Sequence, residues 1–450
     1  MSLDDICEAS RKAAQDGDWE KAWRLVRAHW PDVTADAALA WHWLMLVHHG
    51  ETGLDQRAEV ETILDAYASD PFMTELGTNI LRELVDGRAG DEPIPEDDPA
   101  IVAARKLRRC MQTLGDDERL KDPECGGQLW LTLANCLRLS GPNYDTEAAA
   151  AFEHALSLAP DEPWRWFDFA LFHKLRGRFV HALEIFLRVD AQTDEDDSAT
   201  LNNIAVCATA AGDVDNAEAA WKRLGFDVTR GDDGLPAASI GDVKVRLSTG
   251  GIGDRHPGAG PVQFEHVWVR TLSPCHGVVL NPPMYPVHVA LGDVVLFDRA
   301  PVGFAEHDGH QVPRLPFLKT LREGGTRSFA FRAQQSRAGA VADASDQLPG
   351  EASLYVFDES IQHVCEECIR GDAHSQADVH ASLPDASVVS GVLVVPKETP
   401  LADVARAINL LDEDAVRVLC IPEFRREVGD SLGERRDRER WDALAARHAH

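Results

Sequence analysis

In the first half of the chain, apolar and small residues recur every three or four positions, as they do along one face of a helix. The pattern itself then repeats, because every member of a third set lies 35 residues after its counterpart in a second. The sets are Trp130, Leu133, Ala134, Ala148, Phe152 and Ala155; then Trp166, Phe169, Ala170, Ala182 and Phe186; then Leu201, Ile204, Ala205, Ala217 and Trp221. This periodicity predicts a stack of helix–turn–helix units.

The pattern resembles the tetratricopeptide repeat (TPR), a pair of helices of about 34 residues with small residues where the helices cross. Gly177 and Gly212 each stand five residues before an alanine of the second helix, where the turn is expected. The resemblance covers about residues 1–226 and is most specific over 130–226. It implies a helical solenoid whose concave groove holds a protein or peptide partner.

The second half changes to the alternating pattern of β-strands. Strands are expected at 263–272, 277–280, 292–298, 328–334, 353–358, 387–396 and 415–422, and helices at 317–324, 361–371, 401–412 and 434–447. A short strand-like stretch, 242–247, lies among glycines and prolines that indicate a linker.

Mixed strands and helices predict an α/β or α+β domain in the second half. The chain is therefore expected to be a multidomain protein in which a helical solenoid comes first.

These signals divide the chain into five parts. They are degenerate TPR-like hairpins at 1–90, an acidic loop and helix at 91–129, three TPR-like repeats at 130–226, a Gly/Pro-rich linker at 227–261, and the α/β domain with its C-terminal helix at 262–450.

Charge and targeting signals narrow the class of partner. The chain has 75 acidic and 45 basic side chains, a formal net charge of −30. This charge disfavours nucleic acid and membrane surfaces as partners and suits a basic or hydrophobic peptide.

No secretory signal and no apolar run of about 18 residues is found. The nine cysteines are odd in number and scattered, unlike a disulfide framework. We therefore expect a cytoplasmic protein.

One cysteine motif could carry chemistry. Cys365 and Cys368 form a C-x2-C pair close to His363, which could place two thiolates on one Zn²⁺. Cys275 and His276 are candidates for the remaining ligands, and His374 and His380 lie downstream. A single C-x2-C is also compatible with a redox pair or with two packed thiols, and these alternatives stay open.

Cys275 is also a candidate nucleophile, although adjacent residues point apart and His276 is a poor base for it. No H-E-x-x-H, G-x-S-x-G or nucleotide-binding motif is present. The sequence therefore favours a non-catalytic scaffold or adaptor with an accessory domain that could hold zinc. The alternatives are a metal- or thiol-dependent enzyme whose repeats deliver a peptide, and a structural protein whose solenoid ends stack.

Overall fold

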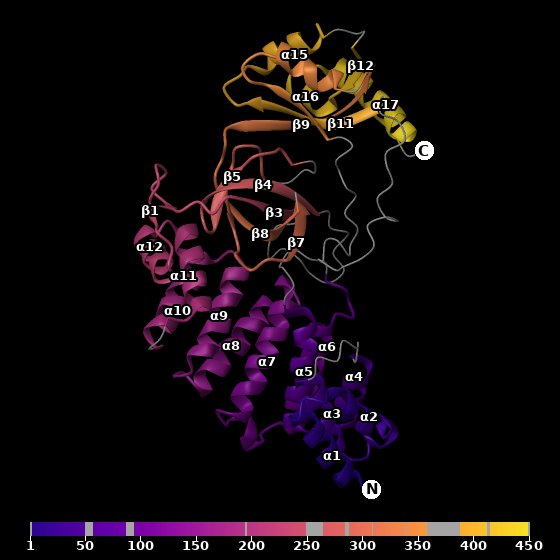
Figure 1. The fold of residues 1–450 in the computed structure, drawn as a ribbon, viewed down its shortest axis with the longest axis vertical. Coiled ribbons are helices and arrows are strands. Elements are labelled where there is room, and N and C mark those ends of the chain that lie inside the picture. Colours follow the sequence, from indigo (N-terminus) through magenta and orange to yellow (C-terminus); the bar gives the residue numbers. More distant parts are fainter. Residues whose placement is uncertain are drawn as a thin grey trace. The chain divides into compact units, whose positions relative to one another are not determined.

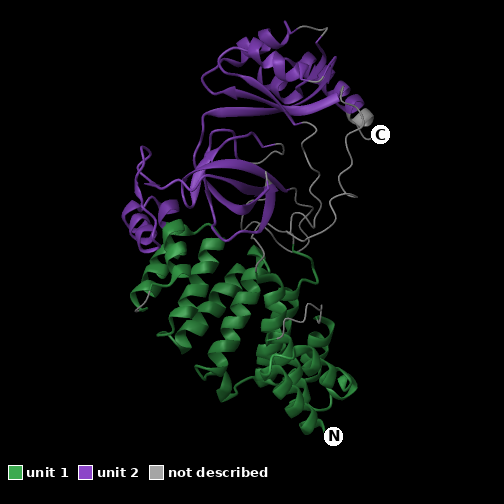
Figure 2. Cartoon of the chain, in the orientation of Figure 1, with its two compact units in different colours: residues 1–207, 250–261 green, residues 208–249, 262–450 purple. Residues whose placement is uncertain are grey.

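The computed structural model describes residues 2–49, 57–86, 94–193, 196–248, 264–283, 288–307, 309–337, 339–357, 388–411 and 415–448. The chain forms two compact units (Figure 2), of which the first ends at Cys207 and the second begins at Ala208, within a single helix. Each unit buries apolar side chains of its own. Over the described ranges we find no helix with the length and apolar character needed to traverse a bilayer.

The first unit is built largely from pairs of packed helices (Figure 1). Within it α1 packs on α2, α5 on α6, α7 on α8 and α9 on α10, and the first helices α5, α7 and α9 also contact one another in turn. The helices are α1 (Leu3–Gln15), α2 (Trp19–Arg27), α3 (Ala37–His49), α4 (Arg57–Ala66), α5 (Pro71–Asp86), α6 (Pro99–Leu114), α7 (Cys125–Leu139), α8 (Asp145–Leu158), α9 (Pro163–Leu175) and α10 (Phe179–Ala191). Next, α11 (Ser198–Ala211) crosses the boundary between the units, and α12 (Val214–Arg223) belongs to the second.

Fourteen of the sixteen positions that define the sequence repeat are buried, while Trp130 and Trp166 are partly exposed. Ten of them have no exposed surface: Ala134, Ala148, Phe152, Ala155, Ala170, Ala182, Phe186, Ala205, Ala217 and Trp221. The turn glycines Gly177 and Gly212 have φ angles of 67° and 75°, in the left-handed region that glycine adopts without a steric penalty. Small residues therefore bring the helices together, and glycines reverse the chain between them.

The second unit contains a closed β-barrel. Five strands form a ring in the order β3-β4-β5-β6-β8, and neighbours in this order are antiparallel. The ring closes where β8 pairs with β3 in parallel, and β7 lies outside the ring and pairs with β8 in antiparallel orientation. The strands are β3 (Asp242–Ser248), β4 (Phe264–Ser273), β5 (His276–Val279), β6 (Val294–Phe297), β7 (Gly303–His307) and β8 (His310–Arg322). A short ribbon of β1 (Thr229–Arg230) and β2 (Pro236–Ala237) precedes the ring. Val245, Val269, Val295 and Phe297 help to fill its interior.

A second, antiparallel sheet has the strand order β10-β11-β9-β12. Along the chain its elements are β9 (Thr326–Gln335), α13 (Ala340–Asp343), the 3-10 turn Ala344–Gln347, β10 (Ser353–Phe357), β11 (Val388–Pro396), α15 (Leu401–Ile408), β12 (Val416–Cys420), α16 (Pro422–Glu427) and α17 (Ser431–His448). This is the split β-α-β topology of ferredoxin-like domains. One face of the sheet packs on α15 and α16, while α17 contacts β9, β11 and β12.

Two sequence predictions in this unit differ from the structure, and the predicted helix 361–371 lies outside the described residues. Residues 317–324, for which a helix was expected, lie largely in strand β8, which pairs with β6 and β3. The stretch 242–247, assigned to the linker 227–261, is strand β3 of the barrel. Because both sheets are antiparallel apart from the β3–β8 pairing, the second half is α+β rather than α/β.

Candidate functional site

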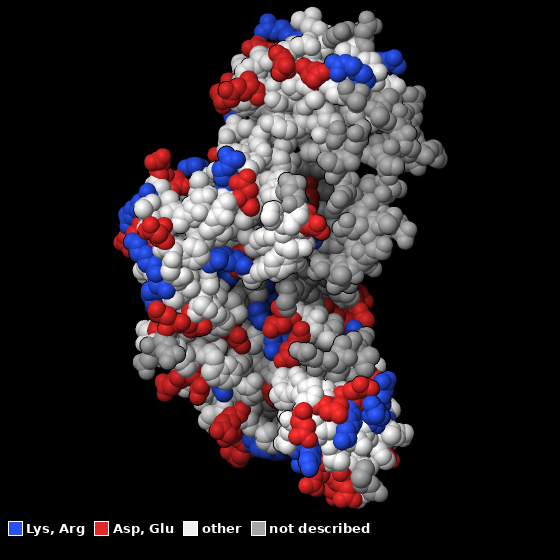
Figure 3. Space-filling view, viewed as in Figure 1, with Lys and Arg blue, Asp and Glu red and all other residues white. Residues whose placement is uncertain are grey.

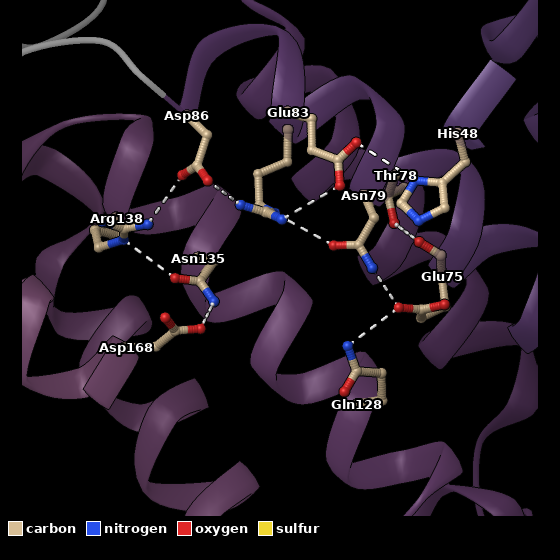
Figure 4. Close-up of polar contacts among 11 residues, drawn as sticks. His48, Glu75, Thr78, Asn79, Glu83, Asp86, Gln128, Asn135, Arg138 and Asp168 are labelled. Carbon is tan, nitrogen blue, oxygen red and sulfur yellow. Dashed lines mark hydrogen bonds and ion pairs between the residues drawn. The ribbon is translucent and has the colours of Figure 1, made fainter. Parts of the chain in front are cut away.

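The first helices of the repeat pairs carry a continuous chain of polar side chains, which we call the polar ladder (Figure 4). It connects α3, α5, α7 and α9 through hydrogen bonds and ion pairs. Its members are His48, Glu75, Asn79, Arg82, Glu83, Asp86, Gln128, Asn135, Arg138 and Asp168. Side chains of one solenoid layer thus contact those of the next.

One end of the ladder centres on Glu75. Its Oε1 accepts hydrogen bonds from Asn79 of the same helix and, at 3.1 Å, from Nε2 of Gln128 on α7. Asn79 Oδ1 accepts from Arg82 Nε at 3.2 Å, and Arg82 Nη1 lies 2.7 Å from Asp86 Oδ2. Glu75 is therefore held by two amide groups, and Arg82 by an amide and a carboxylate.

The ladder continues from α5 to α9 through α7. Asp86 Oδ1 accepts from Arg138 Nη2 at 3.3 Å, and Arg138 Nε donates to Asn135 Oδ1 at 3.1 Å. Asn135 Nδ2 then donates to Asp168 Oδ2 at 2.6 Å (Figure 4). The Arg138 side chain is only 6% exposed but that of Asp86 is 41% exposed, so the ladder reaches from the interior to the surface.

The spacing of these residues explains why they share a surface. Glu75, Asn79, Arg82 and Asp86 lie at intervals of three or four along α5, which places them in one stripe on a helix. Asn135 and Arg138 continue the stripe on α7. This spacing was visible in the sequence, but the hydrogen bonds from helix to helix require the packed repeats.

Two carboxylates of the ladder are unusual in their surroundings. Burial raises the pKa of Glu75, and the hydrogen bond from Gln128 opposes that rise only in part. Burial likewise raises the pKa of Asp168, against the opposing charge of Arg138 and the hydrogen bond from Asn135. Among the described residues neither carboxylate forms an ion pair. Both are held by amide donors alone.

The structure places Cys275 in the turn between β4 and β5, and His276 is the first residue of β5. Ser273 Oγ lies 2.5 Å from His276 Nδ1, and Cys275 Sγ lies 3.6 Å from Thr209 Oγ1. Ser273, Cys275 and His276 have no exposed surface. Burial raises the pKa of Cys275 to about 11 and lowers that of His276 to about 4, with Asp233 opposing the latter shift. Both side chains are therefore neutral near pH 7, as a thiol and an imidazole.

The other predicted metal ligands, His363, Cys365 and Cys368, lie outside the described residues. Zinc binding at the C-x2-C motif stays a prediction. Within the described ranges, no group of three or more His, Cys, Asp or Glu side chains is arranged to hold a metal ion. Asp233 Oδ2 lies 3.8 Å from His276 Nε2, but the two do not form such a group with Cys275. A thiol whose pKa is about 11 is also a poor thiolate donor at neutral pH.

Comparison with known proteins gives similarity to solved structures over about half of the chain. No protein-family model and no curated protein sequence matches the chain. About half of the chain, 49%, is similar to Pseudomonas aeruginosa PilF over 90% of that protein (16% identity, TM-score 0.35). It is also similar to PilW, a type IV pilus biogenesis factor (11% identity, 49% and 91% covered, TM-score 0.38). A Parabacteroides merdae TPR protein matches at 15% identity, with 50% and 78% covered and a TM-score of 0.35.

The N-terminal half is a TPR-like helical solenoid. With these low TM-scores, that assignment rests on the helix pairs and on the fourteen buried repeat positions. The TPR-like unit carries the polar ladder on its first helices, α5, α7 and α9.

Proposed function

We propose that the protein is a scaffold or adaptor that holds a protein or peptide partner on the surface of the polar ladder. The observation that carries this proposal is the ladder itself, a row of hydrogen-bonding groups that crosses three successive first helices and is partly exposed. TPR-type solenoids in general bind proteins or peptides through the surface that their first helices form.

The internal bonding of the ladder supports a binding role. Side chains that are already fixed by hydrogen bonds lose little conformational freedom when a partner arrives, which lowers the cost of association. The amides of Asn79, Gln128 and Asn135 hold the Glu75 and Asp168 carboxylates in fixed positions. A partner would therefore meet a prearranged surface with both carboxylate and amide groups.

The second unit is given an accessory role in this proposal. The rival proposal, a thiol-dependent enzyme, needs a reactive thiolate, and the buried Cys275 gives it no support. The barrel and the ferredoxin-like sheet then serve to position or recognise the partner, and zinc at Cys365 and Cys368 remains a separate proposal for this half of the chain.

Peptide selection followed by footprinting tests the proposed function. Random dodecapeptides displayed on phage would be selected against the full chain, and the selected peptides synthesised. Hydrogen exchange with mass spectrometry would then locate the amides that each peptide protects. We expect protection on α5, α7 and α9, with little change on the second helices α8 and α10. Selected peptides that protect only the second unit, or a selection that yields no binder, would contradict the proposal.

A further inference from the structure

We propose that the polar ladder recognises cationic side chains of its partner, with Glu75 and Asp168 as the residues that bind them. The partner would be an extended protein segment with lysine or arginine residues. This inference rests on the proposed function and adds the chemistry of the partner to it.

The first argument is the bonding of the two carboxylates. Glu75 accepts hydrogen bonds from two amides, and Asp168 accepts one from Asn135. Among the described residues neither pairs with a cation, although both are partly buried. A buried carboxylate gains more from an opposite charge than one in water does, because the local dielectric is low. Arg138 acts on Asp168, and Arg82 on Glu75, without pairing directly with them, and the pKa of each carboxylate stays raised. An ammonium or guanidinium group of the partner would add a direct ion pair.

The second argument is the balance of charge in the ladder. It has four carboxylates, from Glu75, Glu83, Asp86 and Asp168, against the two guanidinium groups of Arg82 and Arg138. Both arginines pair with Asp86, at 2.7 Å and 3.3 Å. An acidic partner would have to break these pairs, whereas a basic partner would leave them in place. Charge complementarity therefore selects a cationic segment.

The net charge of the first unit also favours a cationic partner. Residues 1–207 contain 39 acidic and 20 basic side chains, a formal net charge of −19. Acidic side chains are spread over the visible face of this unit, with basic ones between them (Figure 3). A field of this sign speeds the approach of a basic segment, and the ladder would then fix its register.

The ladder also suggests a spacing for the cationic groups. Gln128, which holds Glu75, and Asn135, which holds Asp168, are seven residues apart on α7. Seven residues of helix span about 10.5 Å. Three residues of a polyproline-type extended chain span about 9 Å and bring side chains back to the same side. Because Glu75 and Asp168 extend from α5 and α9, on either side of α7, this span leaves out their separation across the helices, and we expect basic residues at least three positions apart in the partner.

Fluorescence anisotropy with defined peptides tests this inference on the full chain. The probes are fluorescein-labelled dodecapeptides: four repeats of Lys-Ala-Ala, four of Glu-Ala-Ala, and a peptide in which the same four lysines stand in two adjacent pairs. We expect the regular lysine peptide to bind most tightly and the glutamate peptide not to bind.

Two double variants with the same change of charge distinguish binding by the ladder carboxylates from long-range attraction to the acidic surface. Glu75→Gln/Asp168→Asn removes the proposed carboxylates, and Glu153→Gln/Asp161→Asn removes two exposed ones, on α8 and in the turn after it. We expect at least a tenfold loss of affinity for the regular lysine peptide in the first variant and less than a twofold loss in the second.

Three results would overturn the inference. They are equal losses in both variants, no loss in the ladder variant, and tight binding of the glutamate peptide. Its failure can be told from that of the proposed function by the selection experiment. Acidic or apolar peptides that protect α5, α7 and α9 would refute the cationic partner and keep the scaffold role, whereas peptides that leave these helices unprotected would refute the scaffold role itself.

Discussion

At the scale of single residues, the buried carboxylates of Glu75 and Asp168 serve the proposed binding role but lower the stability of the folded chain at neutral pH. Both have a raised pKa in the folded chain because they are buried. A carboxyl group of this kind holds its proton more tightly in the folded state than in the unfolded one. Its contribution to stability is therefore present below the ordinary pKa, near 4, and is lost as the pH rises through the raised value.

We accordingly expect Glu75→Gln/Asp168→Asn to stabilise the first unit at pH 7. The amides that replace the carboxylates can still accept the hydrogen bonds from Gln128 and Asn135 without a buried charge. A gain of 1 kcal/mol would raise Tm by roughly 2–4 °C in a unit of this size. Thermal unfolding from pH 7 to pH 4 checks this, since the gain should shrink on acidification. A variant that melts below the wild type at pH 7 would show that the charges are not costly.

A second prediction at this scale concerns Cys275. With a pKa of about 11, about one molecule in a thousand carries the thiolate at pH 8, and the side chain is fully buried. We expect iodoacetamide to leave Cys275 unmodified in the native protein and to modify it in guanidinium chloride. Mass spectrometry of tryptic peptides measures both states, with the partly exposed Cys125 as the internal reference. Fast native alkylation of Cys275 would restore the thiol-dependent enzyme as a candidate.

At the scale of elements, local sequence predicted most strands but not their partners. The stretch 317–324 has apolar residues Phe317, Leu318 and Leu321 at helical spacing. In the structure Phe317 pairs with Phe297 of β6, and the same strand pairs with β3 near Leu315. Two neighbouring strands fix this segment as extended, and neither lies beside it in the sequence. Tertiary pairing therefore overrides the local pattern.

The polar ladder likewise could not be predicted from the sequence, because its contacts join different helices. Polar residues at 75, 79, 82 and 86 form a stripe that the sequence displays. What the sequence does not display is that Asn135 of α7 reaches Asp168 of α9, or that Arg138 reaches Asp86 of α5. Helical periodicity identified the buried alanines because each packing position repeats by itself. The ladder residues differ from helix to helix, so no repeat revealed them.

One buried ion pair attaches α17 to the rest of the second unit. Asp437 has no exposed surface and accepts hydrogen bonds from the backbone N–H of Ile421, at 3.1 Å, and from Arg425 Nε, at 3.3 Å. Without Asp437, Arg425 would keep Asp430 at 3.6 Å and Asn409 at 3.0 Å. It would lose its buried carboxylate partner, however, and the Ile421 N–H would lose its acceptor. Loss of hydrogen bonds to a buried charged group typically costs about 1.5–3 kcal/mol. We expect Asp437→Ala to destabilise the second unit by that amount, as measured by urea unfolding.

The exposed Glu439, two residues further along α17, gives the matched control, because Glu439→Ala removes the same charge. We expect this variant to change the free energy of unfolding by no more than about 0.5 kcal/mol. Equal effects of the two substitutions would mean that the net charge of α17, rather than the pair with Arg425, decides the stability.

At the scale of the whole molecule, the acidity of the chain is not evenly spread. Residues 1–207 have a net charge of −19, whereas 242–322, the span of the barrel, contains eight basic and seven acidic side chains. Residues 323–450 carry a further net charge of −9, from 23 acidic and 14 basic side chains, so the barrel is a nearly neutral part of an otherwise acidic chain. The negative charge of the unit with the ladder fits a cationic partner there.

The last prediction follows from the division of the chain into two compact units. Because each buries its own apolar side chains, we expect two separable unfolding transitions in calorimetry. Glu75→Gln/Asp168→Asn should move only the first-unit transition, and Asp437→Ala only the other. Eight of the eleven tryptophans lie in residues 1–207, so tryptophan fluorescence in denaturant assigns the transitions. A single transition that both variants shift would show that the shared helix α11 couples the units into one cooperative body.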